Sequence, residues 1–187
     1  MKKVGLLFLI FMVNSMLFAR WGFGGGGPHF GYNAQGVQSR VYNLTSKQKA
    51  DLKFMFEEEK LARDVYITLG KKWGHRTFLN IQKSEQMHMN RVKFLLNKYG
   101  LRVPYTQNRV GVFENKKLQS LYNKLVKRGS KSLKEALRVG VLVEQTDIKD
   151  LKEKIVGAPA DIKRVYNNLL NGSYRHLRAF NYSLNNI

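Results

Sequence analysis

Apolar residues recur at intervals of three and four along four long segments of the chain, which is the period of an amphipathic α-helix. The first segment begins near Thr45, which forms a capping-box pair with Gln48, and ends between Gly70 and Gly74. The second follows a short turn and ends before Gly100. We therefore expect two helices joined by a tight connection in this half of the folded region.

A long connection, residues 101–129, separates these two segments from the other two. Pro104 and Gly111 interrupt it, and the spacing of Leu118 and Leu125 predicts a short helix within it. A connection of this length can carry the chain from one end of a bundle to the other. We therefore expect the second and third long helices to run parallel.

The third segment opens with Ser132 and Glu135, a second capping-box pattern, and ends at Gly157. The fourth keeps its helical period across the dipeptide Asn171-Gly172, although this dipeptide is a turn signal. A glycine inside a helix costs about 1 kcal/mol relative to alanine. We predict one helix there that can kink at the dipeptide, with a loop at Asn171 as the alternative. No segment predicts a strand, so the predicted fold class is all-α.

The residues before the first helix carry two different patterns. Residues 1–19 combine a basic start, an apolar centre and a terminal alanine, as in a secretory signal peptide. An uncleaved membrane anchor is the alternative, but the apolar run is short for a full span. Residues 20–44 are rich in glycine and predict a flexible linker. We expect a four-helix bundle over residues 45–183 and a secreted or periplasmic protein.

The chain contains no cysteine and has a formal net charge of +20. The absence of cysteine excludes disulfides, thiolate metal sites and cysteine nucleophiles. The positive charge indicates either a solvated basic surface or attraction to an anionic partner. For an exported protein, an anionic lipid surface or an extracellular polymer fits better than nucleic acid.

The apolar face of each predicted long helix carries side chains that can bind metal ions. Buried ionised carboxylates cost several kcal/mol each unless they are paired or bound to metal. Glu85 and His88 stand three residues apart, so they can reach one ion together, and Glu144 and Asp147 have the same spacing. Mixed carboxylate and imidazole ligands suit iron or manganese, with zinc as an alternative. The candidate metal ligands are Glu59, Glu85, His88, Glu144, Asp147 and His176.

Three motifs of the chain resemble the DUF2202 domain family. They are Glu-Glu-Glu-Lys-Leu-Ala-Arg-Asp-Val-Tyr at 57–66, Ser-Glu-Gln-Met-His-Met at 84–89 and His-Leu-Arg-Ala-Phe at 176–180. The order of ligand types over residues 45–180 is also similar to the ferritin-like di-iron carboxylate superfamily. This resemblance implies a ferritin-like four-helix bundle with a long crossover between its second and third helices. It also implies two bound iron ions and relatives that store iron, oxidise ferrous ion or reduce peroxide.

The resemblance also implies a role for individual residues. Glu59, the Glu85–His88 pair and His176 match ligands of the first, second and fourth helices, and Glu144 matches a bridging carboxylate of the third. Asp147 stands where rubrerythrin-like proteins carry a second, mobile glutamate. The chain departs from the superfamily pattern at Ser173, where a glutamate is usual.

Two further expectations concern residues near these ligands. Glu57 and Glu58 should face solvent or the edge of the bundle, with Glu58 as a reserve ligand. Tyr66 should pack in the core, with a hydrogen-bonding role near the metal as the alternative.

Three functions are compatible with the sequence. The first is an exported di-metal oxidoreductase whose substrates are ferrous ion and oxygen or peroxide. The second is a basic, non-catalytic binding module on a ferritin-like scaffold. The third is a structural bundle whose metal site has been lost at Ser173. The sequence does not decide whether the chain turns over a substrate, and a homodimer is compatible with each function.

Overall fold

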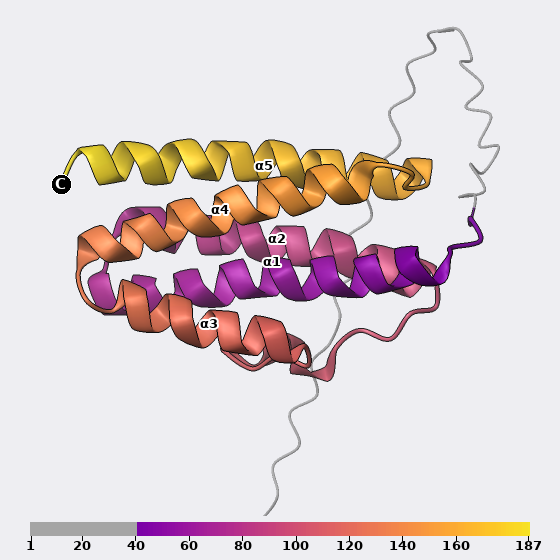
Figure 1. Ribbon diagram of the computed structural model, residues 1–187, viewed down its shortest axis with the longest axis horizontal. Helices are drawn as coiled ribbons and strands as arrows, with labels where there is room; N and C mark the ends of the chain where they lie inside the picture. Colours follow the sequence, from indigo (N-terminus) through magenta and orange to yellow (C-terminus); the bar gives the residue numbers. More distant parts are fainter. Residues whose placement is uncertain (1–40) are drawn as a thin grey trace, which may run out of the picture. The chain divides into compact units, whose positions relative to one another are not determined.

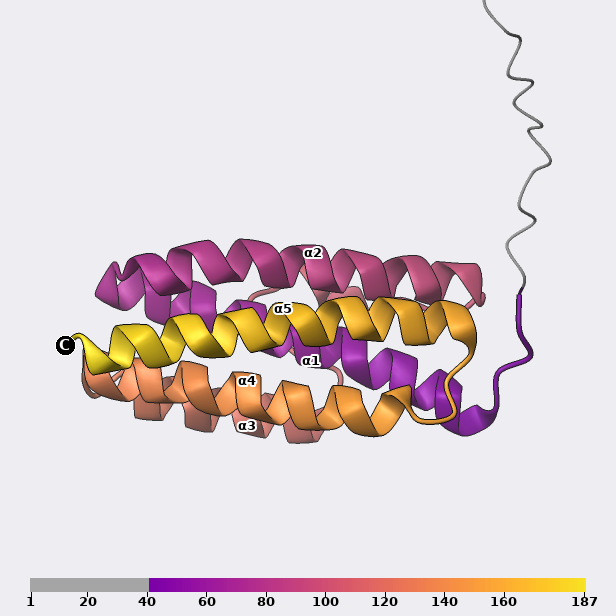
Figure 2. The ribbon, with the colours of Figure 1, turned by 90° about the horizontal axis from the view of Figure 1, so that it is seen from above.

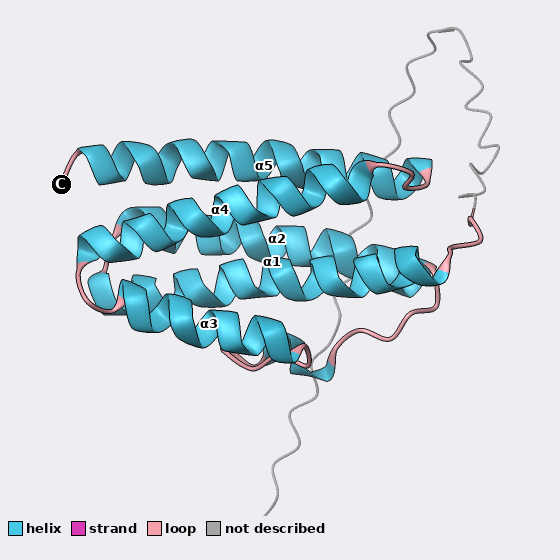
Figure 3. Cartoon of the chain, viewed as in Figure 1, coloured by secondary structure: helices cyan, strands magenta, loops and turns pink. Residues whose placement is uncertain are grey.

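The structure is a computed structural model that describes residues 41–187. The predicted signal peptide and most of the predicted linker lie outside the described residues. Within them the chain forms five α-helices and one short 3-10 helix and contains no strand (Figure 3). The predicted all-α class is therefore confirmed. No helix among residues 41–187 has both the length and the apolar character needed to cross a lipid bilayer.

Four long helices form the bundle, and a fifth covers one side of it. Helix α1 (Ser46–Trp73) pairs with α2 (Arg76–Lys98), and α4 (Leu133–Ile155) pairs with α5 (Ala160–Asn185). The two pairs meet where α1 contacts α4 and α2 contacts α5. Helix α3 (Lys116–Gly129) packs on the outside, against α1 and α4 (Figures 1 and 2).

The connection between α2 and α4 crosses the length of the bundle. It contains the 3-10 helix η1 (Tyr105–Asn108) and then α3, which returns to the end where α4 starts (Figure 1). As a result α2 and α4 run in the same direction, as the sequence predicted. The short helix expected in this connection is present and extends over fourteen residues.

The two predicted capping boxes differ in the structure. The Thr45 backbone N–H donates to Gln48 Oε1 at 2.9 Å, and the Gln48 N–H donates to Thr45 Oγ1 at 3.2 Å, so the first box is complete. Ser132 Oγ accepts the Glu135 N–H at 3.1 Å. The Glu135 carboxylate, however, pairs with Arg128 and Arg138 instead of turning back to Ser132. The second box is therefore only half formed.

Two apolar clusters fill the interior, one toward each end of the bundle. Each long helix passes from one cluster to the other, and the metal-ligand candidates occupy the positions between them. On α1, for example, Phe56 belongs to one cluster, Glu59 lies between, and Leu61 belongs to the other. The helical period thus sets all the candidates at the same level of the bundle.

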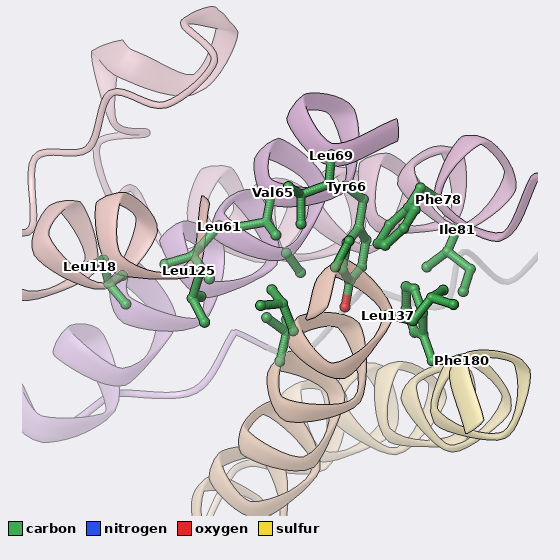
Figure 4. Close-up of a cluster of buried hydrophobic side chains, with 14 of the residues drawn as sticks. Leu61, Val65, Tyr66, Leu69, Phe78, Ile81, Leu118, Leu125, Leu137 and Phe180 are labelled. Atoms are coloured by element: carbon green, nitrogen blue, oxygen red, sulfur yellow. The ribbon is translucent and has the colours of Figure 1, made fainter. Parts of the chain in front are cut away.

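An aromatic group closes one side of that level. The rings of Tyr66, Phe78 and Phe180 lie with their centroids 5.0 to 6.0 Å apart (Figure 4). Gly140 of α4 makes room for Phe180, since a Cβ at this position would lie 2.4 Å from the Phe180 ring. Because Gly140 has no side chain, α4 and α5 can approach each other closely here.

Candidate metal centre

The structure buries all six predicted ligands in the middle of the bundle. Five of them form two triads, in which the ligand atoms lie within 4.8 Å of one another. The triads are Glu59, Glu85 and His88, and Glu85, Glu144 and His176. The sixth residue, Asp147, belongs to neither triad.

Glu85 joins the two triads. Its Oε2 lies 2.9 Å from His88 Nδ1, and its Oε1 lies 2.7 Å from His176 Nδ1. The resemblance implied Glu144 as the bridging carboxylate, but Glu144 belongs to one triad only. The helical period gives the face on which a side chain lies, whereas the rotation of each helix against its neighbours decides which carboxylate stands between the imidazoles.

Both imidazoles direct Nδ1 toward the carboxylates. His88 Nδ1 lies 3.1 Å from Glu59 Oε2, and His176 Nδ1 lies 3.6 Å from Glu144 Oε2. The two rings stack with centroids 5.4 Å apart. His176 Nε2 lies 2.9 Å from the Ser84 hydroxyl, which fixes the orientation of that ring.

Several buried ligand atoms lack a hydrogen-bond partner among residues 41–187. They are Glu59 Oε1, Glu85 Oε1, His176 Nδ1 and Asp147 Oδ1. Glu85 Oε1 and His176 Nδ1 lie close together, yet they are not aligned for a hydrogen bond. Because buried polar atoms in proteins are nearly always paired, four such atoms in one small region fit coordination to a cation. A set of carboxylates and imidazoles suits iron, manganese or zinc.

Charge coupling sets the protonation of the metal-free centre. Burial raises the pKa of both Glu59 and Glu144 to about 7. Burial also acts on Glu85, but its contacts with His176 and His88 outweigh it and lower the pKa to about 2. Burial disfavours both imidazolium ions, yet the surrounding carboxylates raise the pKa of His88 to about 11 and that of His176 to about 10. In the absence of metal, protonated imidazoles therefore balance the carboxylates.

Ser173 holds Asp147 beside the triads. The Ser173 hydroxyl donates to Asp147 Oδ2 at 2.5 Å. Burial, together with the charges of Glu59 and Glu144, raises the pKa of Asp147 well above its usual value. The serine that replaces the expected glutamate on α5 is thus the hydrogen-bond partner of the fourth carboxylate.

Gly172 packs directly against the centre, a role that was not predicted for it from the sequence. Helix α5 is continuous through Asn171-Gly172, so the prediction of one helix is confirmed and the loop alternative is wrong. A Cβ at Gly172 would lie 2.5 Å from His88 Nε2. Glycine is therefore needed for the His88 ring to lie against α5. A turn dipeptide inside an unbroken helical period is the sequence signal that points to such close packing.

Tyr66 both packs in the core and contacts the centre. Its hydroxyl donates to Glu144 Oε1 at 2.6 Å, while its ring lies among the aromatic residues in Figure 4. Burial, with the nearby charge of Glu144, raises the pKa of Tyr66 well above its usual value, so the phenol stays protonated as a donor. The packing role expected from the sequence is confirmed, and the structure adds a hydrogen bond to one of the candidate ligands.

The prediction that Glu57 and Glu58 face solvent or the bundle edge is wrong, because both are buried. Glu57 Oε1 accepts the N–H of Glu114 at 2.7 Å, and its Oε2 accepts the N–H of Asn115 at 3.1 Å. These contacts anchor the start of α3. The period of α1 describes only its own apolar face, and it could not show that α3 covers a second face.

A buried polar cluster on α1 also binds the crossover between α2 and α4 through hydrogen bonds. This cluster was not predicted from the sequence. Lys60 and Asp64 form an ion pair whose side chains are fully buried. Asp64 Oδ2 accepts the N–H of Gly111 at 2.9 Å, and Lys60 Nζ donates to the Arg109 carbonyl at 2.8 Å. Arg63 adds a hydrogen bond from Nη2 to Asp64 Oδ1 at 2.7 Å. Much of the charge in the 57–66 motif therefore positions the crossover and not the metal centre.

Known proteins resemble this chain in sequence and in fold. The family described as "Uncharacterized protein domain (DUF2202)" matches residues 48–186. The uncharacterized protein MJ0754 of Methanocaldococcus jannaschii is 49% identical over 144 residues, covering 76% of this chain and 78% of that protein. The crystal structure of the hypothetical protein MJ0754 from Methanococcus jannaschii superposes with a TM-score of 0.76 at 48% identity, covering 79% of this chain and 85% of that one. A DUF305 fragment from Deinococcus radiodurans, 15% identical with a TM-score of 0.57, covers 78% of this chain and 100% of the fragment and is similar in fold alone.

Proposed function

The chain belongs to the DUF2202 family, and from its buried centre we propose that it is an exported, ferritin-like protein that binds two iron ions. The function we propose is oxidation of ferrous ion or reduction of oxygen or peroxide, with manganese or zinc as alternative metals. The single observation that carries the proposal is that one carboxylate, Glu85, joins two triads of buried ligands. Two divalent ions would balance the negative charge of these buried carboxylates, which water does not solvate.

Each residue of the centre has a role in this proposal. Glu59 and His88 would hold one ion, Glu144 and His176 the other, and Glu85 would serve both. Iron bound there supplies one-electron and oxygen chemistry that the side chains cannot supply themselves. The Tyr66 hydroxyl orients Glu144, and the two apolar clusters keep bulk water away from the ligands.

Anaerobic loading with ferrous ion tests the proposal. We expect close to two irons per chain after desalting, as the two triads require. A Glu135→Gln variant is a suitable control, because Glu135 is a half-exposed carboxylate far along α4 from the ligands. No iron, manganese or zinc above background in a chain with an unchanged helical spectrum would reject the proposal. If iron is bound, measuring the consumption of oxygen and peroxide by the loaded protein distinguishes catalytic turnover from metal storage.

Metal binding should release protons and should strengthen as pH rises. The pKa values of about 11 for His88 and about 10 for His176 mean that both imidazoles are protonated at neutral pH without metal. Each must lose its proton to bind an ion, so protons compete with metal and affinity increases with pH until these groups titrate. Calorimetry in buffers of different ionisation enthalpy counts the protons. Release of about three per filled centre at pH 7 is expected, about two from the imidazoles and about one from Glu59 and Glu144, whose pKa values of about 7 leave each half protonated there. Metal binding without proton release would contradict the assigned ligands.

A second candidate function, a basic binding module, is favoured by the distribution of charge. All thirteen acidic residues lie within residues 41–187, and seven of them are buried. Of the 29 basic residues in the same range, only Lys60 and Arg63 are buried. The surface therefore carries 27 basic residues against six acidic ones. This excess suits an anionic surface or polymer.

Binding to a sulfated polysaccharide and to anionic lipid vesicles tests this second candidate. Affinity should fall steeply between low and physiological salt, because the exposed charges are screened. A Glu85→Gln variant should bind as well as the original chain, since Glu85 is buried. Failure to bind either polyanion at low salt would remove this candidate without affecting the metal proposal.

A further inference from the structure

The outward face of α2 carries large apolar side chains that remain exposed in the folded chain. Phe94 is 65% exposed and Met87 is 56% exposed. They stand seven residues apart, which is two turns of the helix, so both project from the same side, about 10 Å apart along the axis. Leu79, a further exposed apolar residue, lies at the edge of this face. Apolar side chains gathered on one face in this way indicate contact with another surface.

Basic residues alternate with these apolar residues along α2. Lys83 stands four residues before Met87 and Arg91 stands four after it, so all three share one side of the helix, and both basic residues are exposed. The single acidic residue of α2 is Glu85, which is buried in the metal centre. The outward face of α2 therefore sets apolar side chains between positive charges and carries no acidic side chain.

Helix α5 packs beside α2 and adds further positive charge. Its one acidic residue, Asp161, forms an ion pair with Lys98 of α2 at 2.6 Å. Together the two helices contain nine lysine and arginine residues, five in α2 and four in α5, and only two acidic residues. One of these two is buried and the other is paired, so the positive charge of both helices is left unbalanced. The exposed basic residues of α5 are Lys163, Arg164, Arg175 and Arg178.

The combination of charge and apolar side chains selects the kind of partner. A second copy of the chain, docked through this face, would place positive charge against positive charge. A sulfated polymer would pair with the basic residues but would leave Met87 and Phe94 in water. A bilayer of anionic lipids offers both a negative surface and, just below it, an apolar region. Helices that lie at such an interface combine lysine and arginine with phenylalanine and leucine.

We propose that the outward face of α2, with the exposed basic residues of α5 beside it, docks on an anionic lipid bilayer. Phe94 and Met87 enter the boundary between head groups and acyl chains, while Lys83 and Arg91 pair with lipid phosphates. This inference rests on the second candidate function, the basic binding module, and names its partner and its face. It does not depend on metal binding, because none of these four residues belongs to a triad.

Sedimentation of the full chain with vesicles of phosphatidylglycerol tests the role of the charges, in about 0.1 M salt. Lys83→Glu combined with Arg91→Glu should weaken binding about 20-fold or more, since each basic residue at such a surface contributes about fivefold. Lys124→Glu combined with Lys127→Glu is the matched control, because it changes the net charge equally on α3, which packs on α1 and α4 away from α2 (Figure 2). The control should lose less than about threefold, since attraction over more than about 10 Å is screened at this salt concentration.

Two further measurements test the insertion of the apolar side chains. Met87→Ser combined with Phe94→Ser should weaken vesicle binding about tenfold or more and should leave binding to a sulfated polysaccharide unchanged. The chain has no cysteine, so Phe94→Cys gives a single site for a polarity-sensitive fluorophore. Its emission should shift to the blue on phosphatidylglycerol vesicles and not on phosphatidylcholine vesicles. The same fluorophore on Lys124→Cys should report water in both cases.

Several results would overturn the proposal. Binding to the polysaccharide without binding to vesicles would retain the second candidate function but reject the bilayer as partner. A fluorophore at position 94 that stays in water on bound vesicles, or equal losses in the α2 and α3 charge variants, would place the contact elsewhere. A dimer that dissociates in the Met87→Ser, Phe94→Ser variant would assign the face to a second copy. Glu85→Gln should bind vesicles like the original chain, which separates this result from that of the metal proposal.

Discussion

Replacing Glu85 with glutamine is expected to remove both metal ions, whereas Glu59→Gln and Glu144→Gln should each remove one. Glutamine keeps the shape of the side chain but supplies no negative charge and one fewer ligand oxygen. Glu85 belongs to both triads, while Glu59 and Glu144 belong to one each. Metal analysis of each variant after anaerobic loading and desalting, expressed as ions per chain, measures the difference.

Glu57→Gln is the matched control for these three variants. Glu57 is also a buried carboxylate of α1, but its oxygens accept backbone N–H groups at the start of α3. We expect it to lower the stability of the crossover and to leave the metal content unchanged. Retention of one ion in Glu85→Gln, or loss of both in Glu59→Gln, would show that the triads do not share Glu85.

The sequence predicted the four long helices and the level of the centre because both depend on the helical period. Ligand candidates three or four residues apart in phase with apolar neighbours must share a face. On each long helix the ligand candidates lie between the two apolar clusters, as Glu59 does on α1. The candidates of all four helices therefore lie at the same height along the bundle. This is why all six predicted ligands are buried in the middle of the bundle.

The features that the sequence did not predict depend on contacts between segments distant in the chain. Nothing in the period of α1 shows that α3 covers Glu57 and Glu58, or that Lys60 and Asp64 face the crossover. The identity of the bridging carboxylate likewise depends on how each helix is rotated about its axis against its neighbours, which the period of one helix does not give. The spacing of residues within each helix therefore predicts where along the bundle the centre lies. The packing between helices decides which ligands lie next to each other.

The burial of acidic side chains links the metal centre to the basic surface. The bundle places seven of its acidic side chains inside, and most of these lie at the centre or contact the crossover. Few acids then remain to balance the lysines and arginines outside. The high net charge of the chain therefore understates the positive charge of its surface. Binding of anions and binding of metal can be changed independently, because they use different sets of residues.

Gly172→Ala is expected to weaken metal binding by about 10- to 100-fold while leaving the helices intact. Alanine should favour the helix by about 1 kcal/mol, but its Cβ would lie 2.5 Å from His88 Nε2. The His88 ring can avoid this contact only by moving, and its Nδ1 then leaves Glu59 and Glu85. Titration with ferrous or manganous ion, together with the helical spectrum, measures both effects.

Gly70→Ala is the control for this variant. Gly70 is also a buried helical glycine, so alanine gives a similar gain in helix propensity, but a Cβ there meets Phe78 Cβ at 3.1 Å, at a distance that a small shift relieves. Metal affinity should therefore be unchanged in Gly70→Ala. If Gly172→Ala binds metal as tightly as Gly70→Ala does, His88 can move without loss and is not a ligand. A loss of metal affinity in Gly172→Ala but not in Gly70→Ala would instead show that the space left by Gly172 on α5 positions the His88 imidazole on α2.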